Sequence, residues 1–498
     1  MTPFNLAAVG FDWLPVTPLI IIALGAMVVL LAGVRIKDED SAGMGFLTLV
    51  TLLAALIGVL FTFGENRSSF GGALMIDDYA GFFEVAIIVA TALTVAMSIQ
   101  YAADAELAGA EYYGLMLFAV MGMMLMAAAG DLIIVFLGLE TMSIAVYPMV
   151  GLLRREARSS EGAMKYFLLG AFSTGFLLYG IALIYGATGT IRLEPLRALL
   201  ASNPVANTYL ILGLGMILIG FGFKVAAVPF HMWTPDAYEG APTPVTAFMA
   251  VGVKLAAFAA FARIFLVYLG PLSGYWTGAL WLVAVLTMTI GNVVALVQSN
   301  IKRMLAYSAI AHAGYVIVGM AAAPTQSAGA ALLYYLVAYA VTSLGAFAVV
   351  IALERIGEPA LISDYRGLSV RYPGLAAAMT LFMLSLAGVP PLAGFVGKFY
   401  IFSAAVDAGL VWLVVIAVLN SVISAYYYIR VIVAIYMQEG DVAIKPLSAR
   451  PGLLLSVAVA AILVVLVGLM PQPYMTAATN AFASAMGRPA PHALAQAR

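Results

Sequence analysis

The sequence predicts an all-α polytopic membrane protein with about fourteen transmembrane helices, folded as one membrane domain over 1–498. Of its 498 residues, 64% are hydrophobic and only 9% are charged, whereas about a quarter of the residues in a soluble globular domain carry a charge. Apolar stretches of about twenty residues, the length that crosses a bilayer, recur along the whole chain. No linker or low-complexity run divides them, apart from a short Ala/Pro tail after Gly487.

The spans are bounded by charged residues, glycine or proline. Their expected limits are 15–34, 44–63, 79–101, 112–129, 132–153, 163–186, 208–228, 245–268, 275–297, 304–322, 328–353, 373–407, 410–437 and 452–470. Proline removes a backbone donor and clashes with the preceding turn. We therefore expect broken helices where span seven runs into Pro229 and where span twelve contains Pro390 and Pro391.

Composition excludes several classes of function. The 23 basic and 24 acidic residues nearly cancel, so there is no polybasic surface for a nucleic acid. The chain has no cysteine, which excludes disulfides, iron–sulfur clusters and thiolate zinc. Only three histidines, His231, His312 and His492, are present, too few for a multihaem or multicopper electron carrier. We expect no cofactor and no metal on this chain.

The distribution of Lys and Arg predicts the orientation in the membrane. Connections after odd-numbered spans hold twelve basic residues, and the other side holds six: Arg67, Arg192, Arg197, Arg263, Arg488 and Arg498. The twelve are Arg35, Lys37, Arg154, Arg155, Arg158, Lys302, Arg303, Arg355, Arg366, Arg371, Lys445 and Arg450. This bias places the odd connections in the cytoplasm, or in the matrix of a mitochondrion, and both termini on the opposite side. No Lys or Arg precedes span one, so we expect that span to be retained rather than cleaved as a signal.

Charged residues also lie inside the apolar spans. Lys224, Lys254 and Lys398 are well inside, and Glu140 is about eight residues into span five, roughly 12 Å deep at 1.5 Å per residue. An ionised group at mid-bilayer costs about 2.5 to 3.5 kcal/mol on insertion scales, so such residues usually have a function. Further ionisable residues lie nearer the span ends: Lys165 and Arg430, both able to snorkel to the interface, and Glu84, which an interfacial position also explains.

Three lysines cannot all pair with one glutamate. Burial lowers the pKa of a lysine and a nearby carboxylate raises it, so a lysine held between the two tendencies can take up and release a proton. The sequence therefore predicts a proton switch. The alternative is that each group is a satisfied core charge, with Glu140 and one lysine forming a structural bridge.

Polar stripes accompany these charges at helical spacing. They comprise Glu140, Ser143 and Tyr147 on span five, Ser308, His312 and Tyr315 on span ten, and Asn420, Ser424 and Tyr427 on span thirteen. A mid-span imidazole that titrates near neutrality is a good proton relay, which favours His312, and His231 follows the break at Pro229. The alternative is that these residues only make interhelical hydrogen bonds, and that the prolines only kink core helices.

Three long motifs resemble one known family. They are GFGFKVAAVPFHMWTPDAYEGAPTPVTAFM (220–249), KRMLAYSAIAHAGY (302–315) and GVPPLAGFVGKFYIF (388–402). The chain resembles, from span four to span thirteen, the antiporter-like subunits of proton-pumping NADH:quinone oxidoreductase (respiratory complex I) and related multisubunit cation/proton antiporters. Fourteen spans without a long amphipathic extension, and a lysine after the second break, look most like the subunit N branch, equivalent to mitochondrial subunit 2.

The resemblance implies two inverted five-helix repeats, about 112–268 and 275–437, each with a discontinuous third helix, flanked by helices in 15–101 and 452–470. It implies proton-transfer roles for Glu140, Lys224, Lys254, His312 and Lys398. FMN, iron–sulfur clusters and quinone would belong to partner subunits, whose quinone reduction drives pumping. Partners would be other complex I membrane subunits, including further antiporter-like subunits, and membrane lipids, in a bacterial inner membrane.

Three other functions remain open at this stage. A subunit of a multisubunit Na⁺(K⁺)/H⁺ antiporter would have the same architecture and another ion. A scaffold subunit would have lost transport, against which the retained intramembrane charges argue. A quinone-binding subunit would be labelled by a quinone photoprobe.

Overall fold

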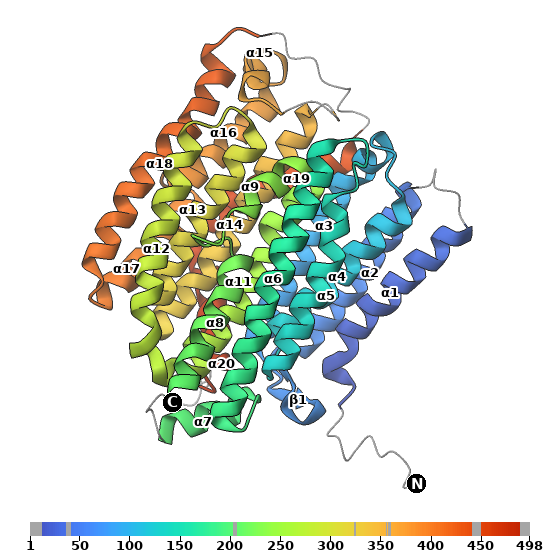
Figure 1. The fold of residues 1–498 in the computed structure, drawn as a ribbon. Helices are drawn as coiled ribbons and strands as arrows, with labels where there is room; N and C mark the ends of the chain where they lie inside the picture. Colours follow the sequence, from blue (N-terminus) through green and yellow to red (C-terminus); the bar gives the residue numbers. More distant parts are fainter. Residues whose placement is uncertain are drawn as a thin grey trace.

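The structure is a computed structural model, and it describes residues 12–35, 41–202, 207–322, 325–354, 356, 360–440 and 450–488. The chain forms a bundle of roughly parallel helices (Figure 1). Twelve helices within these ranges are long and apolar enough to cross a membrane. They are α1 (Thr17–Arg35), α2 (Ser41–Thr62), α3 (Asp78–Asp104), α4 (Gly109–Ala127), α5 (Leu132–Val150), α6 (Ala157–Thr188), the continuous helix Thr243–Tyr268, α12 (Ser273–Leu296), α13 (Ile301–Ala321), α14 (Gln326–Leu353), α18 (Val411–Met437) and α19 (Pro451–Leu469). The all-α membrane fold is confirmed, while the number fourteen stays a prediction.

Both expected helix breaks are present. Helix α8 (Thr208–Lys224) ends before Pro229 and the chain resumes in α9 (Trp233–Gly240). Helix α16 (Pro373–Ala387) ends before Pro390 and Pro391 and is followed by α17 (Ala393–Asp407). Gly388 closes α16 with a left-handed φ of 89°, a conformation that glycine adopts without a steric penalty. Each break falls in the fourth membrane helix of its expected repeat, so the expected third position was wrong. The repeats themselves stay a prediction.

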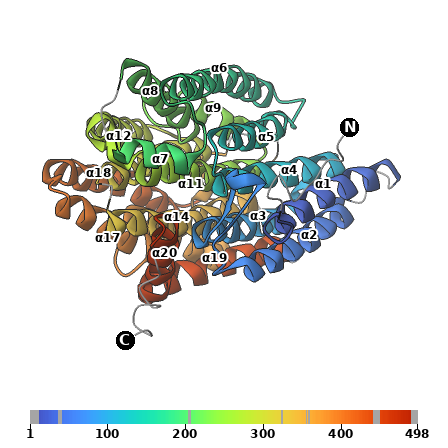
Figure 2. The ribbon, with the colours of Figure 1, turned by 90° about the horizontal axis from the view of Figure 1, so that it is seen from below.

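Three helices occupy the centre of the bundle. Every residue is buried in the 18-residue apolar stretch of the helix Thr243–Tyr268, and 94% and 89% of the residues are buried in the corresponding stretches of α13 and α14. Seen from below, α11 and α14 lie inside a ring of other helices (Figure 2). A helix that is apolar on all sides is stable only when it is surrounded. By contrast, α1, α2, α6, α12 and α18 keep exposed apolar faces, as expected of helices that meet lipid or a neighbouring subunit.

The central helix Thr243–Tyr268 is irregular. It consists of α10 (Thr243–Phe248), a π-helical turn (Met249–Val253), α11 (Lys254–Ala262) and a second π-helical turn (Arg263–Tyr268). Such turns are rare and frequently occur at functional sites. Lys254 is the first residue after the first π turn, so this irregularity sets the direction of its side chain.

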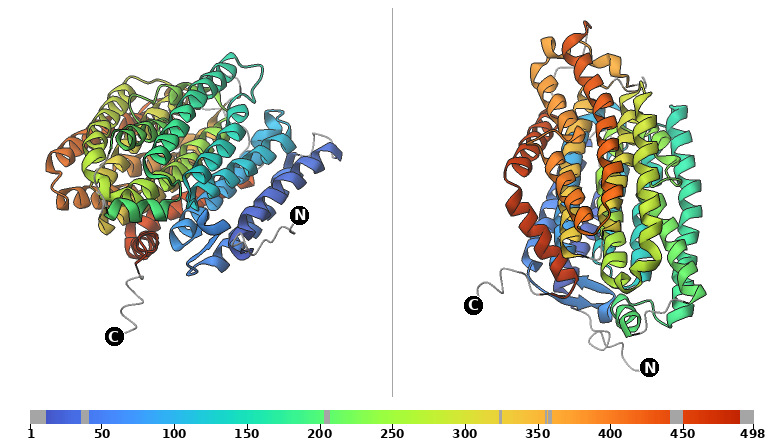
Figure 3. Two further views of the ribbon diagram at one scale, coloured as in Figure 1. Left: turned by 60° about the horizontal axis from the view of Figure 1, so that its bottom comes forward. Right: turned by 90° about the vertical axis from the view of Figure 1, so that its left-hand side faces the viewer.

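Sequence patterns did not predict the short elements at the ends of the bundle. Strands β1 (Arg67–Ser69) and β2 (Leu74–Ile76) pair antiparallel, with Arg67 opposite Ile76. Two short helices lie at the same end as this hairpin (Figures 1 and 3): α7 (Leu193–Ser202) and α20 (Pro471–Ala485). Helix α15 (Leu368–Arg371) lies at the other end. Short 3₁₀ turns occur at Leu14–Val16, Phe70–Gly72, Gly270–Leu272 and Ile362–Tyr365.

The first and last described segments meet at one end of the bundle. The Asp12 amide donates to Ser69 of β1, and Ser484 of α20 donates to Asn66 beside the same hairpin. Which face of the membrane this is stays a prediction. Lys37, Arg355, Lys445, Arg498 and His492 lie outside the described residues.

Arg263, one of the residues used to predict the orientation, lies inside the central helix with only 1% of its surface exposed. Its charge is held by an ion pair within the protein, so it gives no information about the membrane face.

Candidate functional site

The three intramembrane lysines are enclosed by protein. Lys224, Lys254 and Lys398 are 3%, 3% and 4% exposed. None of the ion pairs found among the described residues involves them. They therefore lie away from lipid headgroups, and no carboxylate touches them directly.

Lys224 is the last residue of α8, directly before the first break. Its Nζ lies 5.1 Å from the centre of the Tyr166 ring, 5.3 Å from Tyr147 and 5.6 Å from Phe223. Aromatic faces attract a cation through the ring quadrupole. Nζ has no hydrogen-bond partner in the described part of the chain, so ring faces supply most of its surroundings.

Glu140 approaches Lys224 from α5. Its carboxylate interacts electrostatically with the lysine, although no ion pair or hydrogen bond joins them and Oε1 has no hydrogen-bond partner among the described residues. Helix α5 is held close to α4 at two glycines, because a Cβ on Gly122 would lie 2.5 Å from the Gly138 oxygen. This tight contact fixes the position of Glu140 relative to the bundle.

Only some residues of the polar stripe on α5 face Lys224. Tyr147 places its ring edge-on to Tyr166, with centroids 4.8 Å apart, and Gly170 leaves room for its hydroxyl. Ser143, however, donates to the Leu139 carbonyl of its own helix. Tyr147 is thus a wall of the Lys224 site, whereas the Ser143 hydroxyl is engaged locally.

Lys254 lies at the centre of the molecule. Its Nζ donates to the Ala309 carbonyl on α13 and lies 5.3 Å from the centre of the Tyr339 ring. Tyr339 in turn packs against His312, with ring centroids 5.2 Å apart. One aromatic ring therefore separates the lysine from the histidine.

His312 contacts a tyrosine hydroxyl with each ring nitrogen. Nδ1 is 2.5 Å from the Tyr335 hydroxyl and Nε2 is 3.1 Å from that of Tyr428. Tyr428 is also 2.5 Å from the Ser308 hydroxyl. The His312 ring packs against Tyr339, which neighbours Lys254, and against Tyr315, which neighbours Lys398. His312 therefore lies between the two lysines.

Lys398, on α17, faces the open end of α16. Its Nζ donates to the carbonyls of Leu386 at 3.1 Å and Ala387 at 3.0 Å, and to Ser421 at 2.9 Å. The last carbonyls of a helix have no partner within it, so the break at Gly388 creates the acceptors that hold this ammonium. The ring of Tyr315 lies 5.0 Å away and connects the site to the His312 helix.

Sequence reasoning missed the residues that join the stripes on α13 and α18. Asn292 on α12 accepts from Tyr427 at 2.9 Å and donates to Tyr315 at 3.2 Å and to Asn420 at 3.4 Å. A buried asparagine in an otherwise apolar span was the available signal. Tyr166, Tyr335, Tyr339 and Tyr428 were also missed, because a tyrosine in a membrane helix resembles any other core aromatic.

Three other residues singled out in the sequence lie outside the series formed by the buried lysines, His312 and the tyrosines. Lys165 forms ion pairs of 2.6 Å with Glu161 and Asp236, and His231 is half-buried at the first break with Nδ1 unpartnered within the described residues. Arg430 was expected to be able to snorkel to the interface, which stays a prediction. It donates to the carbonyls of Leu296 and Gln298 at the end of α12.

A buried ion pair, also missed, lies beside the central helix. Arg263 donates two hydrogen bonds of 2.7 Å to Asp77, the N-cap of α3, and its guanidinium lies 4.5 Å from the Tyr79 ring. Glu84 is 8% exposed and interacts with both charges, so it is enclosed by protein. Periodicity could not find this pair, because its members are 186 residues apart.

Comparison with known proteins agrees with the arrangement. The family described as "NADH:quinone oxidoreductase/Mrp antiporter, TM" matches residues 129–424. A relative from Trichlorobacter lovleyi named NADH-quinone oxidoreductase subunit N is 49% identical over 86% of this chain and 88% of its own length. The chain belongs to the subunit N family of NADH-quinone oxidoreductase. A second subunit N, from Chloroflexus aggregans, is 46% identical over 92% of this chain and 94% of its own length.

Solved structures show the same fold in this family and beyond it. A chain of respiratory complex I from Thermus thermophilus with bound aureothin has a TM-score of 0.79 at 35% identity, covering 92% of this chain and 98% of that one. A chain of the Mrp complex from a Dietzia species has a TM-score of 0.82 at 22% identity, covering 95% and 98%, a likeness of fold alone. The subunit N relatives favour the complex I function over the cation antiporter and the scaffold.

No group of three or more His, Cys, Asp or Glu that could hold a metal occurs among the described residues. The aromatic, hydroxyl and imidazole groups around the lysines suit proton transfer, which needs only groups that donate and accept in turn.

Proposed function

We propose that this subunit carries protons across the membrane along its buried lysines, His312 and intervening water, driven by quinone reduction elsewhere in the complex. The observation that carries the proposal is the burial of Lys224, Lys254 and Lys398 without a carboxylate in contact. An ammonium that is buried without a counter-ion is poorly stabilised, so it releases its proton more readily than one in water.

The route has a chemical basis in the second half of the chain. Neutral imidazole accepts a proton at one nitrogen while it donates from the other, and both nitrogens of His312 face tyrosine hydroxyls. Protons would load onto Lys224 and Lys254 from the cytoplasmic side, pass His312 to Lys398, and leave on the opposite face.

Glu140 regulates the binding and release of the proton on Lys224. Two charges about 6.5 Å apart at an effective dielectric of 20 interact by roughly 2.5 kcal/mol. Moving one charge against 100 mV costs about 2.3 kcal/mol. A change in the separation of Glu140 and Lys224 is therefore large enough to drive loading or release. The half-buried position of Glu140 on α5 leaves it accessible to a charge on a neighbouring subunit.

The relatives support a multisubunit membrane setting, and the distribution of Lys and Arg supports the orientation. We infer assembly with other complex I membrane subunits, further antiporter-like subunits among them, in a bacterial inner membrane with both termini on the periplasmic side. FMN, iron–sulfur clusters and quinone would belong to partner subunits. A multisubunit membrane assembly is supported by the complex I and Mrp structures that share this fold.

The test uses the intact complex in proteoliposomes, with proton uptake and NADH oxidation measured together. Lys224→Ala or Glu140→Ala should abolish or severely reduce proton translocation per NADH. Arg154→Ala is the control, because its side chain is 82% exposed. Full pumping in a complex carrying both Lys224→Ala and Glu140→Ala would contradict the proposal. Dependence of transport on Na⁺ or K⁺ would favour the cation antiporter, and normal pumping after Lys254→Met and Lys398→Met would favour the scaffold.

A further inference from the structure

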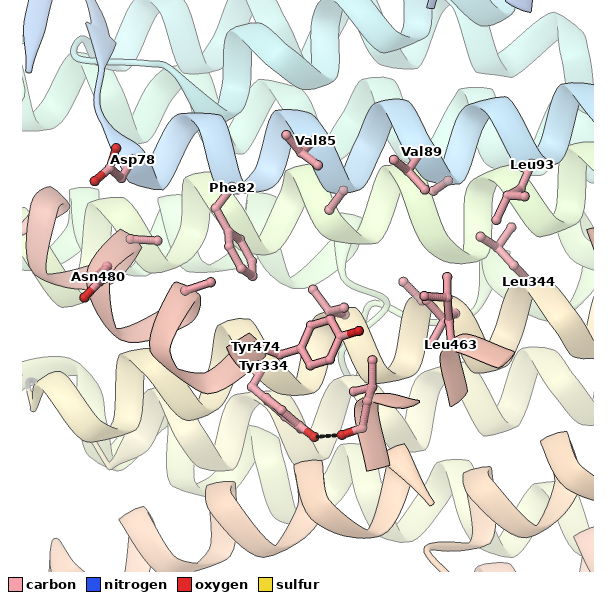
Figure 4. Close-up of a pocket in the computed structure, with 18 of the residues that line it drawn as sticks. Asp78, Phe82, Val85, Val89, Leu93, Tyr334, Leu344, Leu463, Tyr474 and Asn480 are labelled. Carbon is pink, nitrogen blue, oxygen red and sulfur yellow. Dashed lines mark hydrogen bonds between the residues drawn. The ribbon is translucent and has the colours of Figure 1, made fainter. Parts of the chain in front are cut away.

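A cavity of about 590 Å³ opens on the far side of α14 from the lysine chain. Its walls come from α3, α14, α19 and α20 (Figure 4). Tyr334 lines it, whereas the next residue, Tyr335, contacts His312. Cavities of about 300–1,000 Å³ are the size that proteins use for small ligands. The proton route does not involve this space.

The cavity is long, and its inner part is apolar. Its lining follows α3 from Asp78 to Leu93, a length of about 22 Å at 1.5 Å per residue. Figure 4 shows Leu93, Leu344 and Leu463 together at one end, and Asp78 and Asn480 at the other. Half of a bilayer core is about 15 Å thick. The cavity therefore extends from the end of a membrane helix to about the middle of the bilayer, the path of a lipid acyl chain.

The polar end has acceptors and one negative charge. Asp78 is the single charged residue in the described lining, and it accepts a hydrogen bond from the Gly64 amide at 2.8 Å. Asn480 Oδ1 is buried and has no hydrogen-bond partner within the described residues. A ligand that fits this end carries a positive donor, because an anion would face the Asp78 carboxylate at close range.

We propose that the cavity holds one acyl chain of a phospholipid whose headgroup ends in a primary ammonium, as in phosphatidylethanolamine. The acyl chain lies along α3 and α14, and the ammonium donates to Asp78 and Asn480. Bound in this way, the lipid joins the N-terminal helices to α19 and α20 by filling the space between them.

The experiment is photolabelling of the assembled complex in liposomes. The probe is phosphatidylethanolamine with a diazirine near the end of one acyl chain, and peptide mass spectrometry locates the adducts. We expect adducts at Leu93 and Leu344, several-fold more than with phosphatidylglycerol carrying the same labelled chain. Ala86→Trp, which fills the cavity, should remove the adducts, while Leu24→Trp on the exposed face of α1 should not.

Asp78→Asn provides a second variant that keeps the size of the side chain. It should reduce the preference for phosphatidylethanolamine by about threefold, as expected for a partly exposed ion pair. NADH:quinone activity should be unchanged and reports correct assembly. Equal labelling by the two lipids, no adduct on α3 or α14, displacement of the label by excess quinone, or cross-linking of a diazirine amino acid at Val89 to a neighbouring subunit would each overturn the proposal.

Discussion

Nδ1 of His312 lies 2.5 Å from the hydroxyl of Tyr335, one helix away. This contact joins the two most enclosed regular helices of the bundle, α13 and α14, at the level of the lysines. Because a hydroxyl can both donate and accept, the Tyr335 contact is compatible with a proton on Nδ1 of His312 or with a lone pair there.

Tyr335→Phe should reduce proton translocation per NADH several-fold while the complex still assembles, since only one oxygen atom is removed. Proton uptake by proteoliposomes, measured beside NADH oxidation, checks this. The control is the neighbouring Tyr334→Phe. It removes a 2.6 Å hydrogen bond to the Val467 carbonyl, costs about 1 kcal/mol of stability, and should leave pumping intact. Equal pumping by the two variants would argue against a relay through Tyr335.

Lys398→Arg should lose pumping even though it keeps the positive charge. A guanidinium can donate to the same carbonyls, but arginine is not deprotonated in proteins, so it cannot release a proton. The measurement is the ratio of protons moved to NADH oxidised. Lys302→Arg is the matched control, because this buried lysine has a carboxylate partner, Glu354 at 3.5 Å, and should tolerate the change. A fully active Lys398→Arg complex would indicate a structural charge.

Removing one member of the Arg263–Asp77 pair should destabilise the subunit strongly. Arg263→Met leaves the buried Asp77 carboxylate without its cationic partner, and loss of one member of such a pair costs about 3–5 kcal/mol. Thermal unfolding of the purified complex and the yield of assembled subunit measure the effect. The double variant Arg263→Met with Asp77→Leu should recover part of the loss. A double variant less stable than Arg263→Met would contradict this account.

Gly138→Val should separate α5 from α4 and displace Glu140. A Cβ at Gly138 would lie 2.8 Å from the Gly122 oxygen and 2.9 Å from the Met126 nitrogen, and small residues are what allow membrane helices to approach closely. We expect poor assembly and weak proton uptake. Gly175→Ala on α6, where nothing lies within 4 Å, should assemble normally. Normal assembly of Gly138→Val would show that the contact is not needed.

Lys165→Met should have a smaller effect than Lys224→Ala. Lys165 is paired with Glu161 and Asp236 and its side chain is 43% exposed, and ion pairs of this kind contribute about 0–1 kcal/mol. Measuring proton uptake at increasing ionic strength tests this, since salt screens an exposed ion pair. A loss of pumping as complete as that of Lys224→Ala would place Lys165 in the route itself.

The helices and their breaks were predictable because they depend on local composition. Charged residues mark the ends of each span, and the prolines at 229, 390 and 391 fix where α8 and α16 end. The search for long apolar stretches could not find short elements that lack one, such as the hairpin at Arg67–Ile76 and helix α20. Burial of Lys224, Lys254 and Lys398 agrees with their positions well inside the apolar spans.

The partners of these residues were not predictable. Nothing near Lys398 in the sequence shows that the carbonyls of Leu386 and Ala387 turn toward it, and Asn292 reaches Tyr427 across 135 residues. Nor does the sequence show that Arg430 reaches the carbonyls at the end of α12.

By itself the sequence determined that the chain lives in a bilayer, where its helices break, and that it keeps more buried amines than acids can neutralise. These follow from hydrophobicity and covalent geometry, which act over a few residues. Only the tertiary structure decided that tyrosines and His312 fill the space between Lys254 and Lys398, and that Arg263 belongs to Asp77. Those contacts depend on how distant helices pack, since side-chain hydrogen bonds and ring contacts require separations of a few ångströms that one-dimensional spacing does not specify.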